Sequence, residues 1–152
     1  MFGMESLREQ ISREAVEFVD LRVVDLAGRW RHVTVPAERF NDGLMERGVA
    51  FDASNLGYAS VEGSDMVLRP DLATATFVRQ NGERILALIC DILVPQTGER
   101  FSGDPRAVAG RAEAYVAAEG IADAVQMSPE FEFYVFCEAR FCSDPLETSY
   151  AL

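Results

Sequence analysis

The stretch VEFVDLRVVDLAGRWRHVTVP, residues 16–36, decides how this chain begins to fold. Apolar and polar residues alternate through its first half, and this period of two is typical of a strand with one buried face. The residues expected on that face are Val19, Leu21 and Val23. Ala27 and Gly28 supply a turn, and the returning half places Val33 and Val35 inward before Pro36 ends it. The stretch therefore predicts a β-hairpin.

The segments next to this hairpin predict short connections and one long loop. Residues 5–14 carry apolar side chains at helical spacing and predict a short surface helix. Residues 37–48 predict a helical or turn-rich connection that closes at Gly48. Residues 51–64, FDASNLGYASVEGS, are rich in small and turn-forming residues. They predict a long loop, and long loops in small domains are candidates for function.

Three strand-like segments follow, at 65–69, 73–78 and 85–94. The Asn81-Gly82 pair predicts a tight turn between the second and the third, which is the apolar run ILALICDILV. Residues 95–103 have the composition of a linker.

A helix is expected at 105–119, with Asp104 as its N-cap and Pro105 at its first position. Gly120 is expected to close it. Its buried stripe is expected to consist of Val108, Ala109, Ala112, Tyr115 and Val116. The run PEFEFYVF, residues 129–136, predicts a final strand.

The order of these elements predicts an α+β fold. We expect an N-terminal helix at 1–13, a small sheet domain at 14–94, a linker at 95–103, and the incomplete start of a second domain at 104–152. A single helix and a single strand cannot bury a core of their own.

Composition excludes several classes of function. The chain has 152 residues and a net charge of −11, which disfavours nucleic acids and anionic membranes as partners. All 14 of its basic residues are arginines, so neither a lysine-ended phosphate loop nor a Schiff-base lysine is available. His32 is the only histidine, which excludes a histidine-rich zinc site. Three cysteines and no secretory signal predict reduced thiols and a cytoplasmic location.

Glu130 and Glu132 are candidate metal ligands. In a strand, residues two apart point the same way and lie about 7 Å apart. Two carboxylates on one buried face are costly unless a cation lies beside them, and Mg²⁺ or Mn²⁺ with its preference for oxygen ligands meets that need. The alternative is an edge strand with a solvated face.

Asp52 is the second candidate, in the loop FDASNLGYASVEGS. Its side chain can fold onto its own backbone as an Asx turn, which is a structural role. The functional alternative is an exposed carboxylate that binds a small cation.

Several motifs, in order, resemble the glutamine synthetase family. FDASNLGYASVEGSDMVLRPD (51–71) is similar to the family's Phe-Asp-Gly-Ser-Ser loop with its later Glu-x-Ser-Asp-Met, and SPEFEFYVF (128–136) is similar to its Pro-Glu-x-Glu metal strand. The hairpin 16–40 and the segment 89–123 also match, so the resemblance covers residues 14–136.

The resemblance implies a β-grasp N-terminal domain followed by the first helix and strand of the catalytic domain. It implies that Glu132 binds the metal on the glutamate side, that Glu130 binds the metal that holds ATP, and that Asp52 binds ammonium. The implied reaction is the ATP-dependent condensation of glutamate with ammonia through γ-glutamyl phosphate, in a homo-oligomeric ring.

Departures from the family pattern keep alternatives open. Ala53 and Asn55 replace a glycine and a serine of the family loop, so a paralogue that uses a larger amine is one alternative. The tail beyond Phe141 carries no family motif, so we expect a truncated fragment that is inactive alone. A non-catalytic β-grasp module that docks on a full-length ring is the other alternative.

Overall fold

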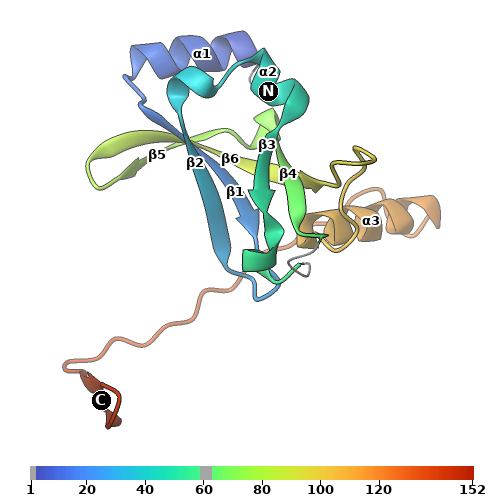
Figure 1. Ribbon diagram of the computed structural model, residues 1–152. Helices are drawn as coiled ribbons and strands as arrows, with labels where there is room; N and C mark the ends of the chain where they lie inside the picture. Colours follow the sequence, from blue (N-terminus) through green and yellow to red (C-terminus); the bar gives the residue numbers. More distant parts are fainter. Residues whose placement is uncertain (1–2, 59–62) are drawn as a thin grey trace.

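The computed structural model describes residues 3–58 and 63–152 (Figure 1). Within these ranges the elements are α1 (Met4–Arg13), β1 (Phe18–Val24), β2 (Trp30–Pro36), α2 (Asp42–Arg47), β3 (Val49–Asp52), β4 (Asp65–Pro70), β5 (Thr76–Gln80), β6 (Glu83–Leu93), α3 (Pro105–Ala118), β7 (Arg140–Ser143) and β8 (Thr148–Ala151). Short 3-10 helices connect them at Ala37–Arg39, Ala53–Leu56 and Leu72–Thr74.

The first six strands form one sheet with β6 at its centre. The order is β2-β1-β6-β4-β3, and β5 also pairs with β6. On one edge β6 runs parallel to β1, and on the other it runs antiparallel first to β5 and then to β4. From Ile85 to Leu88 the side chains on both faces of β6 are also buried, and the run ILALICDIL supplies apolar residues for both faces. The apolar strand expected at 85–94 is confirmed.

The hairpin expected at 16–36 is confirmed as β1 and β2, which pair in antiparallel register. All three residues expected on the inner face of β1, namely Val19, Leu21 and Val23, are buried. The turn is organised by Asp25, whose Oδ1 accepts hydrogen bonds from the backbone amides of Ala27 and Arg29, both at 2.9 Å. These bonds, with those from the Arg29 and Arg31 side chains, lower the pKa of Asp25 to about 2 despite its burial.

A threonine side chain bridges the break between β4 and β5. The backbone amide of Ile89 in β6 donates to Thr74 Oγ1 at 2.8 Å, and the Ile89 carbonyl accepts from the Asp71 amide at 2.9 Å. Neither backbone group of Ile89 is therefore left unsatisfied where the partner strand bends away. The tight turn after β5 is also confirmed, since Asn81 and Gly82 both have positive φ, at 51° and 90°.

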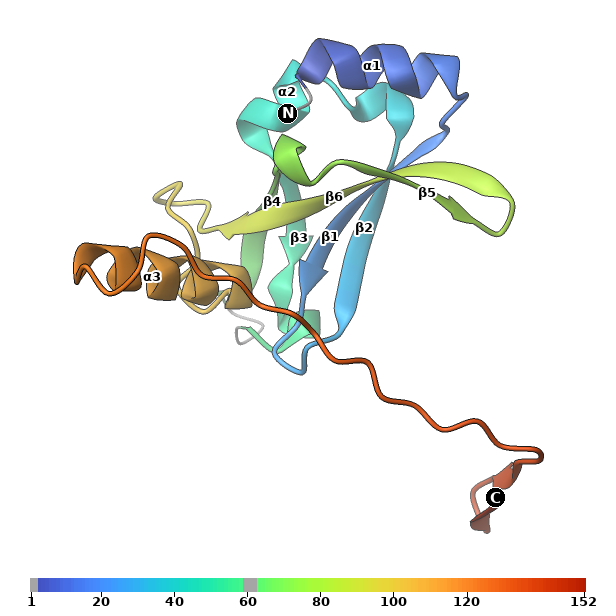
Figure 2. The same ribbon diagram turned by 180° about the vertical axis from the view of Figure 1, so that it is seen from behind.

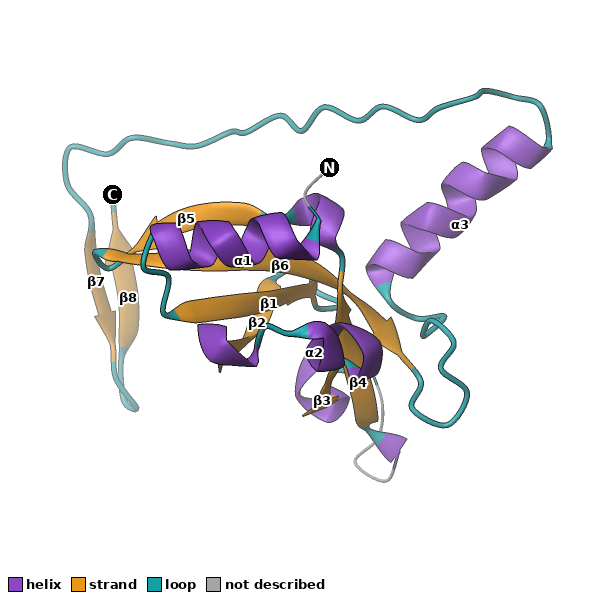
Figure 3. Ribbon diagram, turned by 90° about the horizontal axis from the view of Figure 1, so that it is seen from above, coloured by secondary structure: helices purple, strands orange, loops and turns teal. Residues whose placement is uncertain are grey.

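The core lies on one face of the sheet, beneath α1 and α2. Leu7 of α1 and Leu44 of α2 join the apolar residues of β1, β4 and β6 in one buried cluster. Figure 3, seen from above, shows α1 in front of the sheet and running in nearly the same direction as β6. The helix expected at 5–14 and the turn-rich connection that closes at Gly48 are therefore both confirmed.

One strand follows directly after the predicted connection at 37–48 and extends into the start of the loop predicted at 51–64. Residues Val49–Asp52 form β3, which pairs with β4 at the edge of the sheet. The stretch VAFD is too short for its alternation to be distinguished from a loop by pattern alone. Pairing with β4 decides its conformation.

Helix α3 forms as expected, but its predicted buried stripe is wrong. The Asp104 carboxylate accepts a hydrogen bond from the Arg106 amide, Pro105 is at the first turn, and Gly120 follows the C-terminus with φ +65°. Yet Val108 and Tyr115 are 48% and 62% exposed, and Ala107 is the buried residue of the helix. An apolar stripe is buried only where another element covers it, and here only the first turn meets the sheet.

No helix in the described ranges is long and apolar enough to cross a membrane.

The strand expected at 129–136 is not paired. The segment is extended but has no neighbouring strand, and Phe131 is 86% exposed. Figure 2 shows it running away from the sheet toward the small hairpin of β7 and β8. A strand requires a partner for its backbone groups, and no described residue provides one.

We expect truncation of Leu88 and of Val108 to have very different effects on stability. Leu88 is fully buried in β6, so Leu88→Ala should lower the free energy of unfolding by about 2–5 kcal/mol. Val108→Ala, on the exposed face of α3, should change it by no more than about 0.5 kcal/mol. Urea unfolding followed by circular dichroism measures both. Equal losses would contradict the assignment of the core to the sheet face beneath α1.

Candidate functional site

Asp52 lies where β3 ends and the candidate loop begins. It stands opposite Asp65 of β4 in the antiparallel register. Directly after it, the Ala53 amide donates to the Ser64 carbonyl at 2.9 Å, which closes the base of the loop. The Ala53 side chain is fully buried, whereas Asp52 is exposed. The chain therefore anchors itself at residue 53 and leaves the preceding carboxylate in solvent.

The Asp52 carboxylate is held in a fixed, ionised state. Its Oδ1 accepts a hydrogen bond from the Ser54 amide at 2.9 Å, which is the Asx turn expected from the sequence. Hydrogen bonds from the side chains of Ser54 and Ser64, together with that amide, lower the pKa of Asp52. The turn and the exposed carboxylate are thus not alternatives, because the turn uses Oδ1 and orients the whole group.

The far part of the loop is tied to the hairpin and the linker. Gly57 adopts φ +77°, and the Tyr58 hydroxyl that follows donates to the Val24 carbonyl at the end of β1. The Tyr58 ring meets Phe101 edge-on, with 5.7 Å between centroids. Burial raises the pKa of Tyr58 to about 12, so the hydroxyl remains a donor. Residues 59–62 of the expected loop lie outside the described residues.

Glu130 and Glu132 lie on the extended segment after α3, and both are exposed. Tyr134 and Phe136, which the sequence placed on the same side as the glutamates, stack with 6.1 Å between their centroids. This contact is consistent with a period of two along the segment. In the described part of the chain no three possible ligands group to hold a metal ion.

Sequence reasoning missed an ion cluster that fixes the start of α3. The Arg106 guanidinium binds Asp71, and it binds Asp91 of β6 at 2.7 Å. Arg100 of the linker reaches the same Asp91 oxygen, also at 2.7 Å. The carboxylates belong to the turn after β4 and to β6, and the arginines to the linker and to α3, so four segments converge here. No local pattern in the sequence signals such a cluster.

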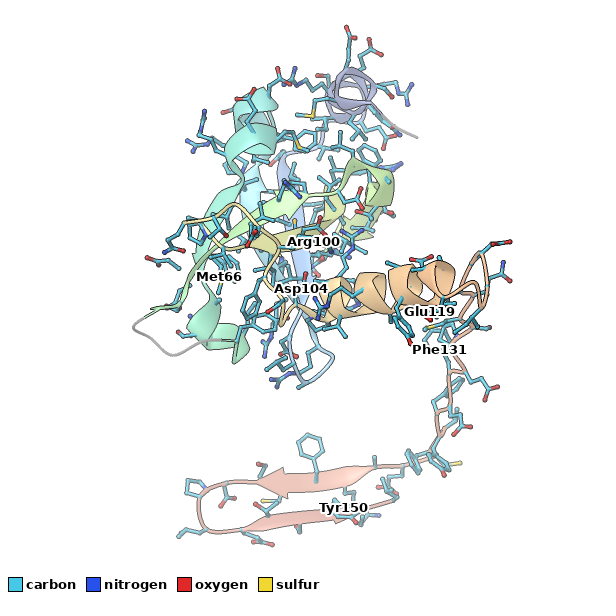
Figure 4. All side chains as sticks on the ribbon, turned by 90° about the vertical axis from the view of Figure 1, so that its right-hand side faces the viewer. Met66, Arg100, Asp104, Glu119, Phe131 and Tyr150 are labelled. Carbon is cyan, nitrogen blue, oxygen red and sulfur yellow. The ribbon has the colours of Figure 1, made fainter. Side chains whose placement is uncertain are left out.

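Asp104 lies beside this cluster and is almost completely buried, at 2% exposure (Figure 4). Its Oδ1 accepts from the Arg106 amide at 3.1 Å, while its Oδ2 has no hydrogen-bond partner among the described residues. Burial raises the pKa of Asp104. The charged form of the α3 N-cap therefore carries a desolvation cost that its hydrogen bond from the Arg106 amide and the nearby Arg100 do not fully offset.

Comparison with known proteins gives a family match over the sheet. Residues 15–95 match the family model described as glutamine synthetase, beta-grasp domain. The chain is 39% identical over 145 residues to the glutamine synthetase of Bradyrhizobium diazoefficiens, covering 95% of this chain and 31% of that protein. It is 41% identical over 140 residues to that of Escherichia coli K12, covering 91% of this chain and 30% of that protein. The chain thus spans less than a third of the length of these relatives.

Solved structures show the same fold. A cryo-EM structure of Plasmodium falciparum glutamine synthetase matches with a TM-score of 0.76 at 24% identity, over 99% of this chain and 29% of that one. Together with the family match, this confirms the expected β-grasp fold. The expected division at 14–94, 95–103 and 104–152 stays a prediction.

We expect Asp104→Asn and Asp71→Asn to change the pH dependence of unfolding in opposite directions. The raised pKa of Asp104 means that wild type loses stability as pH rises above about 4, and the asparagine, which still caps the helix, removes that loss. The pKa of Asp71 is lowered, chiefly by its hydrogen bond from Arg106, so its contribution is present above about pH 4 and is lost as pH falls.

The measurement is the free energy of unfolding of each variant, relative to wild type, from pH 3 to pH 8. The difference should rise with pH for Asp104→Asn and fall with pH for Asp71→Asn. Parallel curves for the two variants would refute the opposite assignments.

Proposed function

This chain belongs to the glutamine synthetase family, and from that premise we propose that it forms the N-terminal part of an ATP-dependent ligase that joins glutamate to ammonia. The observation that supports the proposal most directly is Asp52, an exposed carboxylate held in one orientation at the end of β3. The position matches the family loop that the resemblance assigns to ammonium.

The lowered pKa of Asp52 favours one role over another. A carboxylate with a lowered pKa is a strong partner for a cation but a weak base. Asp52 would therefore bind ammonium chiefly by charge, and would receive a proton only as the nitrogen attacks the acyl phosphate. Anchoring at Ala53 fixes where the ammonium is held.

Glu130 and Glu132 would serve as metal ligands in the complete enzyme. Their carboxylate oxygens fit the preference of Mg²⁺ or Mn²⁺, but such ions take about six ligands, and the described chain groups no three together. Further ligands must come from more protein, in cis or in trans. When bound, the metals would neutralise phosphate charge during transfer from ATP.

The exposed face of α3 supports assembly with that additional protein. A hollow of about 550 Å³ lies between α3 and the segment after it, lined in part by Ala109, Val116, Val125 and Met127. Apolar hollows of this kind are normally covered in a finished domain. A homo-oligomeric ring, as the resemblance implies, is part of the proposal.

The 152-residue chain alone should form no glutamine. The physical reason is that two carboxylates cannot complete the metal sites that organise the phosphates. The assay is the formation of γ-glutamyl hydroxamate from glutamate, ATP and hydroxylamine with Mg²⁺ or Mn²⁺. Turnover by the purified chain would overturn this expectation.

In a complete enzyme that carries this chain, the three carboxylates should fail in different ways. Glu132→Ala should mainly weaken glutamate use and Glu130→Ala mainly ATP use, each with altered metal dependence, because each holds a different metal. Asp52→Ala should spare the phosphate chemistry and raise the KM for ammonium. Steady-state kinetics with each substrate varied separately makes the distinction.

The matched control is Glu83→Ala, an exposed carboxylate at the start of β6. It should leave all four dependences unchanged. If Asp52→Ala behaves like this control, the assignment of Asp52 to ammonium fails.

A further inference from the structure

A second hollow, of about 410 Å³, lies between the edge strands β2 and β3 and the segment 37–48 that connects them. Val35 near the end of β2 and Val49 at the start of β3 line it, with Leu44 of α2. β2 and β3 are opposite ends of the sheet order, so only the curl of the sheet brings them to one hollow. The hollow is separate from the loop that carries Asp52.

The charged side chains in the lining of this hollow are both hydrogen-bond donors. Arg39, Asn41 and Arg47 line it, and none of the described carboxylates does. The carboxylates that neighbour the two arginines in sequence, Glu38, Asp42 and Glu46, do not line the hollow, and Asp42 is paired with Arg8 at 2.9 Å. In a chain of net charge −11, the positive charge is therefore confined to the lining itself.

These two arginines are exceptional within the chain. Ten of the 14 arginines form an ion pair with a described acidic residue. Four do not, and Arg111 among them donates to the Ser102 carbonyl at 2.8 Å. The others are Arg39, Arg47 and Arg79, and the first two face the same hollow. Guanidinium groups left without a carboxylate partner are suited to an external oxyanion.

A glycine makes room for one of the two guanidiniums. A Cβ added at Gly43 would lie 2.6 Å from Arg47 Nη2, so a side chain at residue 43 would displace the Arg47 guanidinium from its present position. Asn41 caps the same turn by accepting from the Leu44 amide at 3.1 Å. The cap and the glycine together place Arg47 over the hollow.

We propose that this hollow binds a small oxyanion, the phosphate or carboxylate group of a free small molecule. Arg39 and Arg47 supply the charge-assisted donors, and the valine and leucine side chains form the wall. Because both arginines are exposed, binding is sensitive to ionic strength. The site goes beyond the proposed ligase chemistry, since it uses none of Asp52, Glu130 and Glu132.

The experiment titrates the 152-residue chain with inorganic phosphate, and separately with succinate, at pH 7.5. Binding is followed by NMR on the backbone amides of residues 37–49 and on the arginine side chains. The variants are Arg39→Gln, Arg47→Gln and Gly43→Ala, and the matched control is Arg79→Gln, which removes the same charge from β5. Thermal unfolding of each variant reports folding.

We expect saturable chemical-shift changes, confined to the residues of this hollow, with at least one of the two probes. The probe that binds more tightly identifies the oxyanion as a phosphate or a carboxylate. Arg39→Gln and Arg47→Gln should each weaken binding about tenfold, whereas Arg79→Gln should leave it within about twofold of wild type. Gly43→Ala should weaken binding by moving Arg47, while helix α2 becomes no less stable.

Three results would overturn the site. One is no saturable response to either probe. Another is that Arg79→Gln weakens binding as much as Arg39→Gln and Arg47→Gln do, which would show that binding depends only on the overall charge of the chain. The third is a response that depends on protein concentration and not on the probe, which would assign the hollow to an acidic side chain of a second copy.

Discussion

β6 hydrogen-bonds along both of its edges at once, to β1 on one side and to β5 and then β4 on the other. The pairing with β1 is parallel, so the strands that form it must be joined by a long crossover. That crossover contains β2, α2, β3, β4 and β5. The other elements of the sheet domain are therefore placed by the position that β6 takes in the sheet. Closing this long loop costs conformational entropy, and only the pairing of β6 with β1 compensates for that loss.

The candidate site depends on the same strand through β4. β4 pairs with β6 on one side and β3 on the other, and Asp52 ends β3. The Asp71–Arg106–Asp91 cluster uses β6 again, this time to fix the start of α3. Tyr58, which reaches both the end of β1 and Phe101, joins the two regions. The sheet thus holds the Asp52 loop at the end of β3 and fixes the first turn of α3 beside β6.

The sequence predicted best where the decisive contacts are local. The first hairpin, the Asn81-Gly82 turn and the caps of α3 all depend on residues a few positions apart. Prediction from the sequence failed where the conformation or burial of a segment depends on residues far away in the chain. β3 exists because β4 lies beside it, and the stripe with Val108 and Tyr115 stays exposed because no described element covers it. The unpaired segment at 129–136 has the alternation of a strand but no partner.

The candidate site divides in the same way. The α+β class, the family resemblance and the identities of Asp52, Glu130 and Glu132 could be read from the order of the residues, because residue order and spacing are local properties. The folded chain was needed to show that Asp52 is exposed and ionised, that Arg106 bridges two distant aspartates, and that Arg39 and Arg47 share a hollow. Each of these depends on residues that the chain brings together across the curl of the sheet, and no pattern along the sequence records which side chains a folded sheet makes neighbours.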